Sequence, residues 1–186
     1  MSQKKLHTNT LIPLCLKGNR TAQLELYNRY YRGMYNVSYR IVRDSAVAED
    51  VMQESFLSAL TKLDSFKGEV SFGAWLKRIV VNNSIHEYRK QIKRQEVDIQ
   101  NMMYKIEDNE VYVSDNVEVQ LKAQKVMDTM KQLNDNYRIS LTLHLIEGYD
   151  YEEICQIMNI SYANCRTMIS RAKESLRKKL NMVYNA

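Results

Sequence analysis

The chain has 186 residues with only 5 Gly and 1 Pro, and its 27 Lys and Arg outnumber its 22 Asp and Glu to give a net charge of +5. The turns of many β-hairpins would need more Gly and Pro than this, and segments with the periodicity of an α-helix recur throughout the chain. We therefore expect an all-α protein. No segment approaches twenty uninterrupted apolar residues and the start has too short an apolar run for a signal peptide, so we expect a cytoplasmic protein.

The charge is unevenly divided along the chain. Residues 1–94 carry 16 Lys and Arg against 8 Asp and Glu, residues 95–120 carry 1 against 7, and residues 121–186 carry 10 against 7. Basic blocks favour polyphosphate partners, although a mild excess of this kind is also usual on a plain solvated surface. The pattern gives weak support to nucleic-acid binding by the two flanking blocks.

Cysteine and histidine usage argues against a metal centre. Cys15, Cys155 and Cys165 form no CxxC pair, and the three histidines are scattered, so we expect reduced thiols, no metal site and no cofactor. No HExxH, GxxxxGK[ST], paired-carboxylate or nucleophile pattern stands out. We therefore expect no catalytic residue, no enzyme activity and no small-molecule substrate.

In the N-terminal block, residues 20–43 show the period of an amphipathic helix rich in Tyr. Ser45 can cap a second helix, whose core stripe runs through Ala48, Met52 and Phe56. The opposite face of that helix carries a polar, acidic group of residues with one Leu: Asp50, Gln53, Glu54 and Leu57. Taken by itself, such a face is best explained as an ordinary solvated surface, and docking onto a basic protein surface is the alternative.

A third helix is predicted to follow Gly68, with Ser71 as its cap. Asn82, Asn83 and Ser84 are poor helix formers in its middle, so either packing or function retains them. Nearby cations and aromatic side chains match what base-edge contacts and stacking on single strands require. Phe72 and Trp75, however, are better explained as core residues.

Residues 95–120 follow no sustained 3.6-residue period, and acidic and amide residues dominate them. The segment is therefore predicted to be a flexible acidic linker between two small helical domains, residues 1–94 and 121–186.

The segment EEICQIMNISYANCRTMISRAKESL, residues 152–176, predicts two helices with almost no room to turn between them. Asn159 tolerates the left-handed conformation that ends a helix, and Ser161 can cap the next one. An apolar stripe then runs from Cys165 through Ile169 and Leu176 to Leu180. This is the pattern of a helix-turn-helix, whose second helix can enter a major groove.

The second helix of this motif keeps polar and basic residues outside its apolar stripe. Asn can pair bidentately with adenine and Arg with guanine, so Asn164 and Arg166 are the best candidates for reading sequence. Basic residues further along are expected to be either phosphate contacts or solvent-facing charges. The whole predicted DNA-binding set is Tyr162, Asn164, Arg166, Thr167, Ser170, Arg171, Lys173, Arg177 and Lys178.

Three blocks in order, AEDVMQESFLSAL (48–60), FGAWLKRIVVNNSIHEYRK (72–90) and residues 133–176, resemble a bacterial sigma factor of the extracytoplasmic-function (ECF) group of the sigma-70 family. The resemblance covers nearly the whole chain. It implies that the first block grips the clamp of the largest subunit of RNA polymerase. The second block resembles the segment that recognises and melts the minus-ten element, and the third resembles the four-helix domain that reads the minus-thirty-five element and touches the polymerase flap.

The resemblance thus implies a transcription initiation factor that binds core RNA polymerase, brings it to a two-part promoter and helps to open the DNA. Asp50, Gln53, Glu54 and Leu57 would dock on the clamp, and the acidic linker would run through the polymerase cleft. An anti-sigma factor, in some family members membrane-anchored, would occlude both domains. The residues expected at the minus-ten element are Lys67, Ser71, Arg78, Asn82, Asn83, His86, Arg89 and Lys90.

The chain departs from the family pattern at positions that bear on promoter choice. His86 stands where the family usually has Asp, Asn164 and Cys165 stand where it has Thr-Val, and Met168 stands where it has Arg. Cys165 keeps the apolar character that the fold needs. At the other three positions the resemblance does not specify which promoter sequence is recognised.

Two other classes of protein fit parts of the sequence. A conventional helix-turn-helix regulator with an N-terminal sensing domain accounts for the C-terminal half, but not for the block at 48–60 or the block at 72–90. A nucleic-acid enzyme lacks the motifs named above.

Overall fold

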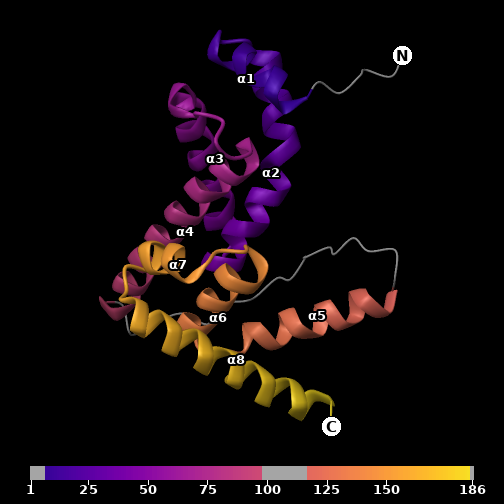
Figure 1. Cartoon of the computed structure of the whole chain (residues 1–186), viewed down its shortest axis with the longest axis vertical. Coiled ribbons are helices and arrows are strands. Elements are labelled where there is room, and N and C mark those ends of the chain that lie inside the picture. Colours follow the sequence, from indigo (N-terminus) through magenta and orange to yellow (C-terminus); the bar gives the residue numbers. More distant parts are fainter. Residues whose placement is uncertain (1–6, 98–116, 185–186) are drawn as a thin grey trace. The chain divides into compact units, whose positions relative to one another are not determined.

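The computed structural model describes residues 7–97 and 117–184, and it divides into two compact units, Met1–Glu107 (unit 1) and Asp108–Ala186 (unit 2). All regular elements in the described residues are helical, which confirms the expected all-α fold of two helical domains (Figure 1). Unit 1 contains α1 (Thr8–Leu16), α2 (Arg20–Val42), α3 (Ser45–Thr61), the 3-10 turn η1 (Leu63–Ser65) and α4 (Phe72–Val97). Unit 2 contains α5 (Val117–Lys131), α6 (Asp135–Leu141), the π-helical turn η2 (Thr142–Ile146), α7 (Tyr151–Met158) and α8 (Tyr162–Tyr184).

The predicted linker, residues 95–120, is helical at both of its ends. α4 continues to Val97 and α5 begins at Val117, and residues 98–116 lie outside the described part of the chain.

Short polar side chains set the helix boundaries of unit 1. Asn19 caps α2 by accepting a hydrogen bond from the Ala22 amide at 3.0 Å, and Arg43 ends α2 in the left-handed region with φ 61°. The cap of α3 is Asp44, whose carboxylate accepts from the Val47 amide at 2.9 Å, so the prediction that Ser45 is the cap is wrong by one residue. Because α2 ends at Arg43, the next residue, Asp44, already has an extended backbone with φ −131°. This is the conformation that an N-cap residue adopts.

Helices α2, α3 and α4 pack against one another and form the core of unit 1 (Figure 1). Leu26, Ile41, Phe56, Leu76 and Val80 are each no more than 2% exposed in this core. Burying side chains of this size stabilises a fold by about 1.5–3 kcal/mol each. The three helices therefore share one core, and the side chains outside it are presented at the surface of unit 1.

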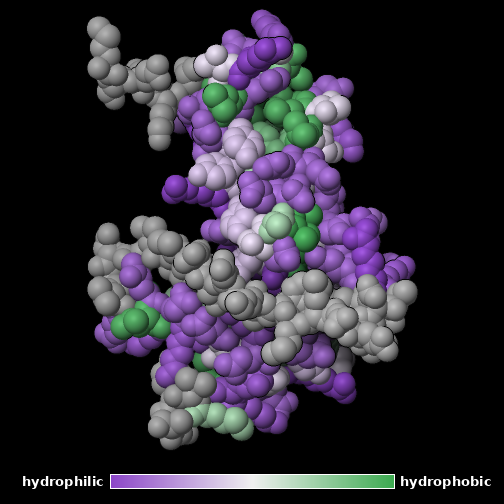
Figure 2. Space-filling view, turned by 180° about the vertical axis from the view of Figure 1, so that it is seen from behind, coloured by the Kyte–Doolittle hydropathy of each residue, from purple (hydrophilic) through white to green (hydrophobic). Residues whose placement is uncertain are grey.

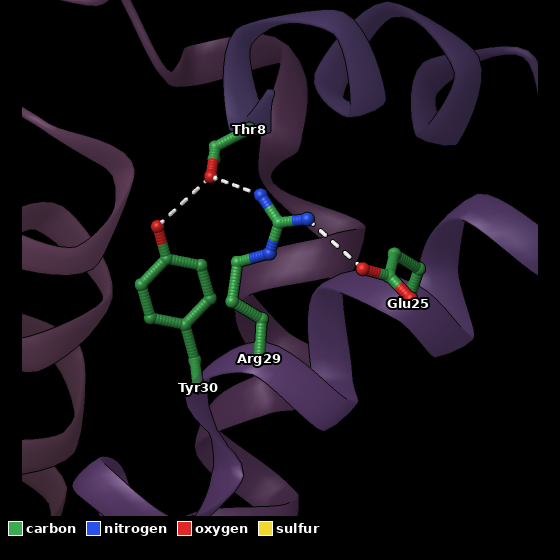
Figure 3. Close-up of polar contacts among 4 residues, drawn as sticks. All are labelled: Thr8, Glu25, Arg29 and Tyr30. Carbon is green, nitrogen blue, oxygen red and sulfur yellow. Dashed lines mark hydrogen bonds and ion pairs between the residues drawn. The ribbon is translucent and has the colours of Figure 1, made fainter. Parts of the chain in front are cut away.

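The sequence did not predict α1, which packs on α2 through buried Leu11 and Cys15. A polar network holds it there (Figure 3). The guanidinium of Arg29 on α2 donates to the Thr8 hydroxyl at 3.0 Å and pairs with Glu25 at 2.9 Å, while the Tyr30 hydroxyl lies 3.2 Å from the same Thr8 oxygen. These contacts fix the first turn of α1 against the middle of α2.

An aromatic cluster anchors the start of α4. The ring of Phe72, which is 2% exposed, meets Tyr30 edge-on at 5.3 Å and Trp75 at 5.8 Å, and Phe66 lies 5.3 Å from Trp75. Gly73 permits this approach, because a Cβ atom there would lie 2.9 Å from the Tyr30 ring. The expectation that Phe72 is a core residue is confirmed, and Trp75 is half-buried in the same cluster.

Unit 2 is a four-helix domain in which α5, α6 and α7 all contact α8. Its core contains Ile139, Leu141, Leu143, Ile154 and Ile169, all no more than 1% exposed. The long α8 is thus supported along one side by three other helices.

Candidate functional site

The predicted docking face of α3 is exposed. Asp50, Gln53, Glu54 and Leu57 all lie at the surface, and the Leu57 side chain is 66% exposed. The Gln53 amide donates to Glu49 at 3.1 Å, one turn earlier on the same helix. The arrangement presents acidic and amide groups around one apolar side chain, which is suited to contact with a basic, partly apolar surface.

An open groove of about 400 Å³ lies beside this face, between α2 and α3. The side chain of Leu24, on the α2 side, is 59% exposed and stands across the groove from Leu57 and Gln53. Hydrophobic residues also gather at the upper end of unit 1 in the view of Figure 2, whereas most of the remaining visible surface is hydrophilic. The groove is lined by Arg20, Gln23, Leu24, Tyr27, Gln53, Phe56, Leu57 and Leu60.

The α2 side of this groove was not among the predicted functional residues. The signal was present, because Leu24 is an apolar residue that falls outside the core stripe of residues 20–43. Only the packing of α3 against α2 brings it next to Leu57.

The predicted minus-ten residues on α4, apart from Asn83, form a stripe on its accessible side. Asn82 and His86 are exposed and one turn apart, and the exposed Arg89 and Lys90 continue the stripe by another turn. Half-buried Arg78 lies one turn before Asn82. This stripe combines an amide and an imidazole, which can contact base edges, with cations, which can contact phosphates.

The two residues after Asn82 face into unit 1 instead. Asn83 is half-buried and its amide nitrogen donates to Ser55 on α3 at 2.9 Å. Ser84 is fully buried. Its hydroxyl donates to the Val80 carbonyl at 2.7 Å, and its oxygen lies 3.0 Å from the hydroxyl of Ser38 on α2, from which it can accept. The three poor helix formers in the middle of α4 therefore have two different environments, one at the surface and one between helices.

The loop before α4 exposes both residues predicted there, Lys67 and Ser71. The Ser71 hydroxyl accepts a hydrogen bond from the Ala74 amide at 3.2 Å, so it is the cap of α4 as expected. The aromatic cluster of Phe66, Phe72 and Trp75 fixes both ends of this loop.

The helix-turn-helix of unit 2 follows the predicted turn chemistry. Asp150 and Glu153 form a reciprocal capping box at the start of α7, at 2.8 and 3.1 Å. Asn159 ends α7 in the left-handed conformation with φ 51°, and the Ser161 hydroxyl accepts from the Asn164 amide at 3.3 Å to cap α8. The predicted functions of Asn159 and Ser161 in the turn are confirmed.

Helix α8 separates its two faces cleanly. Cys165, Ile169 and Ala172 are fully buried and Leu176 is 7% exposed, as the predicted stripe requires, whereas Leu180 at its end is half-buried. Among the predicted DNA-binding residues, Lys173 is half-buried and the others are exposed: Tyr162, Asn164, Arg166, Thr167, Ser170, Arg171, Arg177 and Lys178.

Two side chains on the exposed face of α8 already have intrahelical partners. The Thr167 hydroxyl donates to the Ala163 carbonyl at 2.9 Å, which leaves its oxygen as an acceptor. Lys178 pairs with Glu174 at 2.8 Å, and this contact lowers the pKa of the Glu174 carboxyl. Glu174 was not part of the predicted set, and it adds a negative charge to the exposed face of α8.

Burial of Cys165 beneath the turn raises the pKa of its thiol to about 11, and a hydrogen bond to the neighbouring Cys155 adds to the shift. Its sulfur also lies 3.8 Å from the Tyr151 carbonyl oxygen. Cys165 is therefore a neutral packing residue that holds α7 against α8.

Within residues 7–97 and 117–184, no three His, Cys, Asp or Glu side chains gather as a metal ion would require. Of the helices described, none combines the length and the apolar run of a membrane span.

A helix-turn-helix with an exposed basic second helix, joined in one chain to a separate helical unit, is the architecture of a two-domain DNA-binding protein. Comparison with known proteins makes the class specific. Sigma-70 region 2 matches residues 26–94 and Sigma-70 region 4 matches residues 123–176.

Similarity to individual proteins extends over most of the chain. It is 30% identical to the ECF RNA polymerase sigma factor SigW of Bacillus subtilis over 88% of this chain and 91% of that protein. It is 28% identical to the ECF RNA polymerase sigma-E factor of Haemophilus influenzae over 95% of this chain and 97% of that protein. Its fold is similar to that of the sigma factor RpoE, solved in complex with the anti-sigma factor NepR from Bartonella quintana, with a TM-score of 0.60 and 21% identity over 84% of this chain and 95% of that one. The chain belongs to the ECF group of the sigma-70 family.

Proposed function

We propose that this sigma factor binds core RNA polymerase through unit 1, directs it to promoters through both units and helps to open the DNA. The observation that carries the proposal is that the two units of this sigma factor expose chemically different surfaces. Unit 1 exposes an acidic and apolar docking face, and unit 2 exposes a basic recognition helix.

The docking face on α3 is the proposed contact with the polymerase clamp. Asp50, Gln53 and Glu54 supply polar and acidic groups, and Leu57 supplies an apolar anchor next to the groove. We add Leu24 on α2 to this surface, because it lines the same groove. Exposed apolar side chains that gather in a patch rimmed by polar residues are typical of protein–protein interaction sites.

The proposed minus-ten contacts are the α4 stripe and the loop Lys67–Ser71. An extruded base needs a pocket or a stacking partner to offset an unstacking cost of about a few kcal/mol. The loop is fixed by aromatic packing at both ends, and the adjacent stripe offers Asn82 and His86 for base edges.

The proposed minus-thirty-five reader is the N-terminal part of α8. Asn164 and Arg166 are exposed in its first turns, where a recognition helix meets base edges. Arg171, Arg177 and Lys178 lie further along and are assigned to phosphates.

The remaining assignments follow from the family. We propose a cytoplasmic, non-catalytic protein that works without a cofactor and is controlled by an anti-sigma factor, some forms of which are membrane-anchored. The exposed apolar groove on unit 1 supports such a partner, because a protein that covers the groove would compete with polymerase for it. The proposed contact with the flap belongs to unit 2, and the proposed passage through the polymerase cleft belongs to residues 95–120.

The test is run-off transcription with purified core polymerase, comparing the native chain with a variant that carries Gln53→Ala and Glu54→Lys. We expect the native chain to support initiation and the variant to lose co-purification with core polymerase at an unchanged melting temperature. The matched control is Asp64→Lys, an equal charge change at an exposed residue of η1 away from the groove. A chain that leaves core polymerase unable to initiate would instead be a conventional helix-turn-helix regulator.

A further inference from the structure

One polar contact joins the docking helix to the promoter-contacting helix. The Asn83 amide nitrogen on α4 donates to the Ser55 hydroxyl oxygen on α3 at 2.9 Å, and Ser55 donates its own hydrogen to the Val51 carbonyl at 2.6 Å. Ser55 is fully buried, so the contact is shielded from water. Because the Ser55 hydrogen is already committed to Val51, its oxygen is held as an acceptor in one orientation.

The contact lies directly behind both proposed interfaces. Ser55 follows Gln53 and Glu54 on α3 but points inward, whereas those two residues are exposed. Asn83 follows Asn82 on α4, and a step of one residue along a helix turns it by about 100° away from the exposed stripe. The hydrogen bond therefore links the inner side of the docking helix to the flank of the DNA-contacting stripe.

This geometry gives Asn83 a different function from that of Asn82. An exposed amide is available to base edges, but the Asn83 nitrogen is turned toward α3 and engaged there. We propose that Asn83 is a positioning residue that acts through Ser55: the pair sets the rotation of α4 on α3, and so aims Asn82 and His86 at the minus-ten DNA once polymerase holds α3. The inference rests on the proposed function.

A double-mutant cycle tests the pair, using Ser55→Ala, Asn83→Ala and both together. Each variant is assembled with core polymerase, and three quantities are measured: affinity for core polymerase, the rate of promoter opening from 2-aminopurine fluorescence in the minus-ten element, and preference among minus-ten variants. Coupled residues give non-additive effects, whereas independent ones add.

We expect each single substitution to slow promoter opening by about two- to tenfold, which corresponds to the usual net free energy of one hydrogen bond. The double variant should be no slower than either single one, and polymerase affinity and base preference should be retained. If Asn83 instead contacts a base directly, Asn83→Ala will change base preference, its effect will multiply with that of Ser55→Ala, and the inference is wrong.

Ser84→Ala is the matched control. It removes a buried hydroxyl from the next position of α4, where the partner is Ser38 on α2 and not the docking helix. Opening should be close to native in this variant, and an equal loss would mean that the Ser55 effect reflects general core stability. The outcomes also separate the two proposals: a native chain that does not initiate with core polymerase contradicts both, while native initiation with unchanged opening in all variants contradicts only the positioning of α4 by Ser55.

Discussion

Helices α4 and α8 are both long, both rich in cations and both proposed to contact DNA. They differ in how much of their circumference is buried. In α8 the buried residues form a single narrow stripe, from Cys165 to Leu176. In α4 the buried residues include the adjacent pairs Val80–Val81 and Ser84–Ile85, and this wide arc leaves less of the helix for solvent. The difference arises because α4 packs against both α2 and α3.

The comparison shows where helical periodicity is informative. A helix supported along one side divides its residues into two faces that a period of 3.6 residues reveals. A helix packed on two sides also buries positions that carry polar residues, and these then need partners on the neighbouring helices. Ser84 with Ser38 and Asn83 with Ser55 are such pairs.

The largest effects are expected from truncation of the two cores. Leu76→Ala in α4 and Ile169→Ala in α8 each remove a fully buried side chain, so each should lower the free energy of unfolding of its own unit by about 2–5 kcal/mol. Differential scanning calorimetry should show one transition shifted and the other unchanged. If either substitution shifts both transitions together, the units are not separate cooperative bodies.

Arg166→Ala tests whether the exposed face of α8 recognises specific bases. We expect a loss of roughly 1–3 kcal/mol at the native promoter, with relaxed preference at one base pair. Lys178→Ala is the control, and it should weaken binding about equally on all sequences with a shallower salt dependence. Affinities for a library of upstream elements at two salt concentrations separate the two. A uniform loss in Arg166→Ala would make Arg166 only an electrostatic anchor.

The buried stripe of α8 should give unit 2 a stability that depends on pH. Burial raises the pKa of the Cys165 thiol from its usual 9.0 to about 11, so between these values the unfolded chain holds fewer protons than the folded one. The free energy of unfolding is therefore unaffected by this thiol below about pH 9 and falls as pH rises toward 11. Denaturant unfolding at pH 8 and 10.5 measures the fall, and Cys165→Val should reduce it. An equal fall in that variant would assign the effect to other groups.

The buried pair Ser38 and Ser84 should show the asymmetry of an internal hydrogen bond. Ser38→Ala alone removes one partner of a 3.0 Å contact between fully buried residues, and we expect a loss of about 1 kcal/mol. Ser38→Ala with Ser84→Ala removes both polar groups and should cost less than the sum of the two single changes. Strict additivity in urea unfolding would show that the two hydroxyls do not interact.

The smallest effect is expected at Glu174. Its ion pair with Lys178 is exposed, so its loss should change stability little. Glu174→Gln should nevertheless strengthen DNA binding slightly, because it frees Lys178 and removes a negative charge near the phosphates. The gain should vanish at high salt, and weaker binding would mean that Glu174 positions Lys178 for its phosphate.

The local features of this protein follow from its sequence. The apolar stripe of α8, the left-handed Asn159 and the caps at Ser71 and Ser161 each depend on groups no more than a few residues apart. Periodicity and capping chemistry act over this range, so the helix-turn-helix and the exposed face of α3 could be predicted before any tertiary contact was known.

Tertiary structure alone decided the features that join distant parts of the chain. The Asn83–Ser55 contact spans 28 residues, the Ser84–Ser38 contact spans 46, and the groove places Leu24 next to Leu57. The attachment of α1 by Thr8 and Arg29 has the same character. Helical periodicity specifies which residues share a face of one helix, but the partner of a buried polar group is set by how neighbouring helices cross, and that depends on packing throughout the unit.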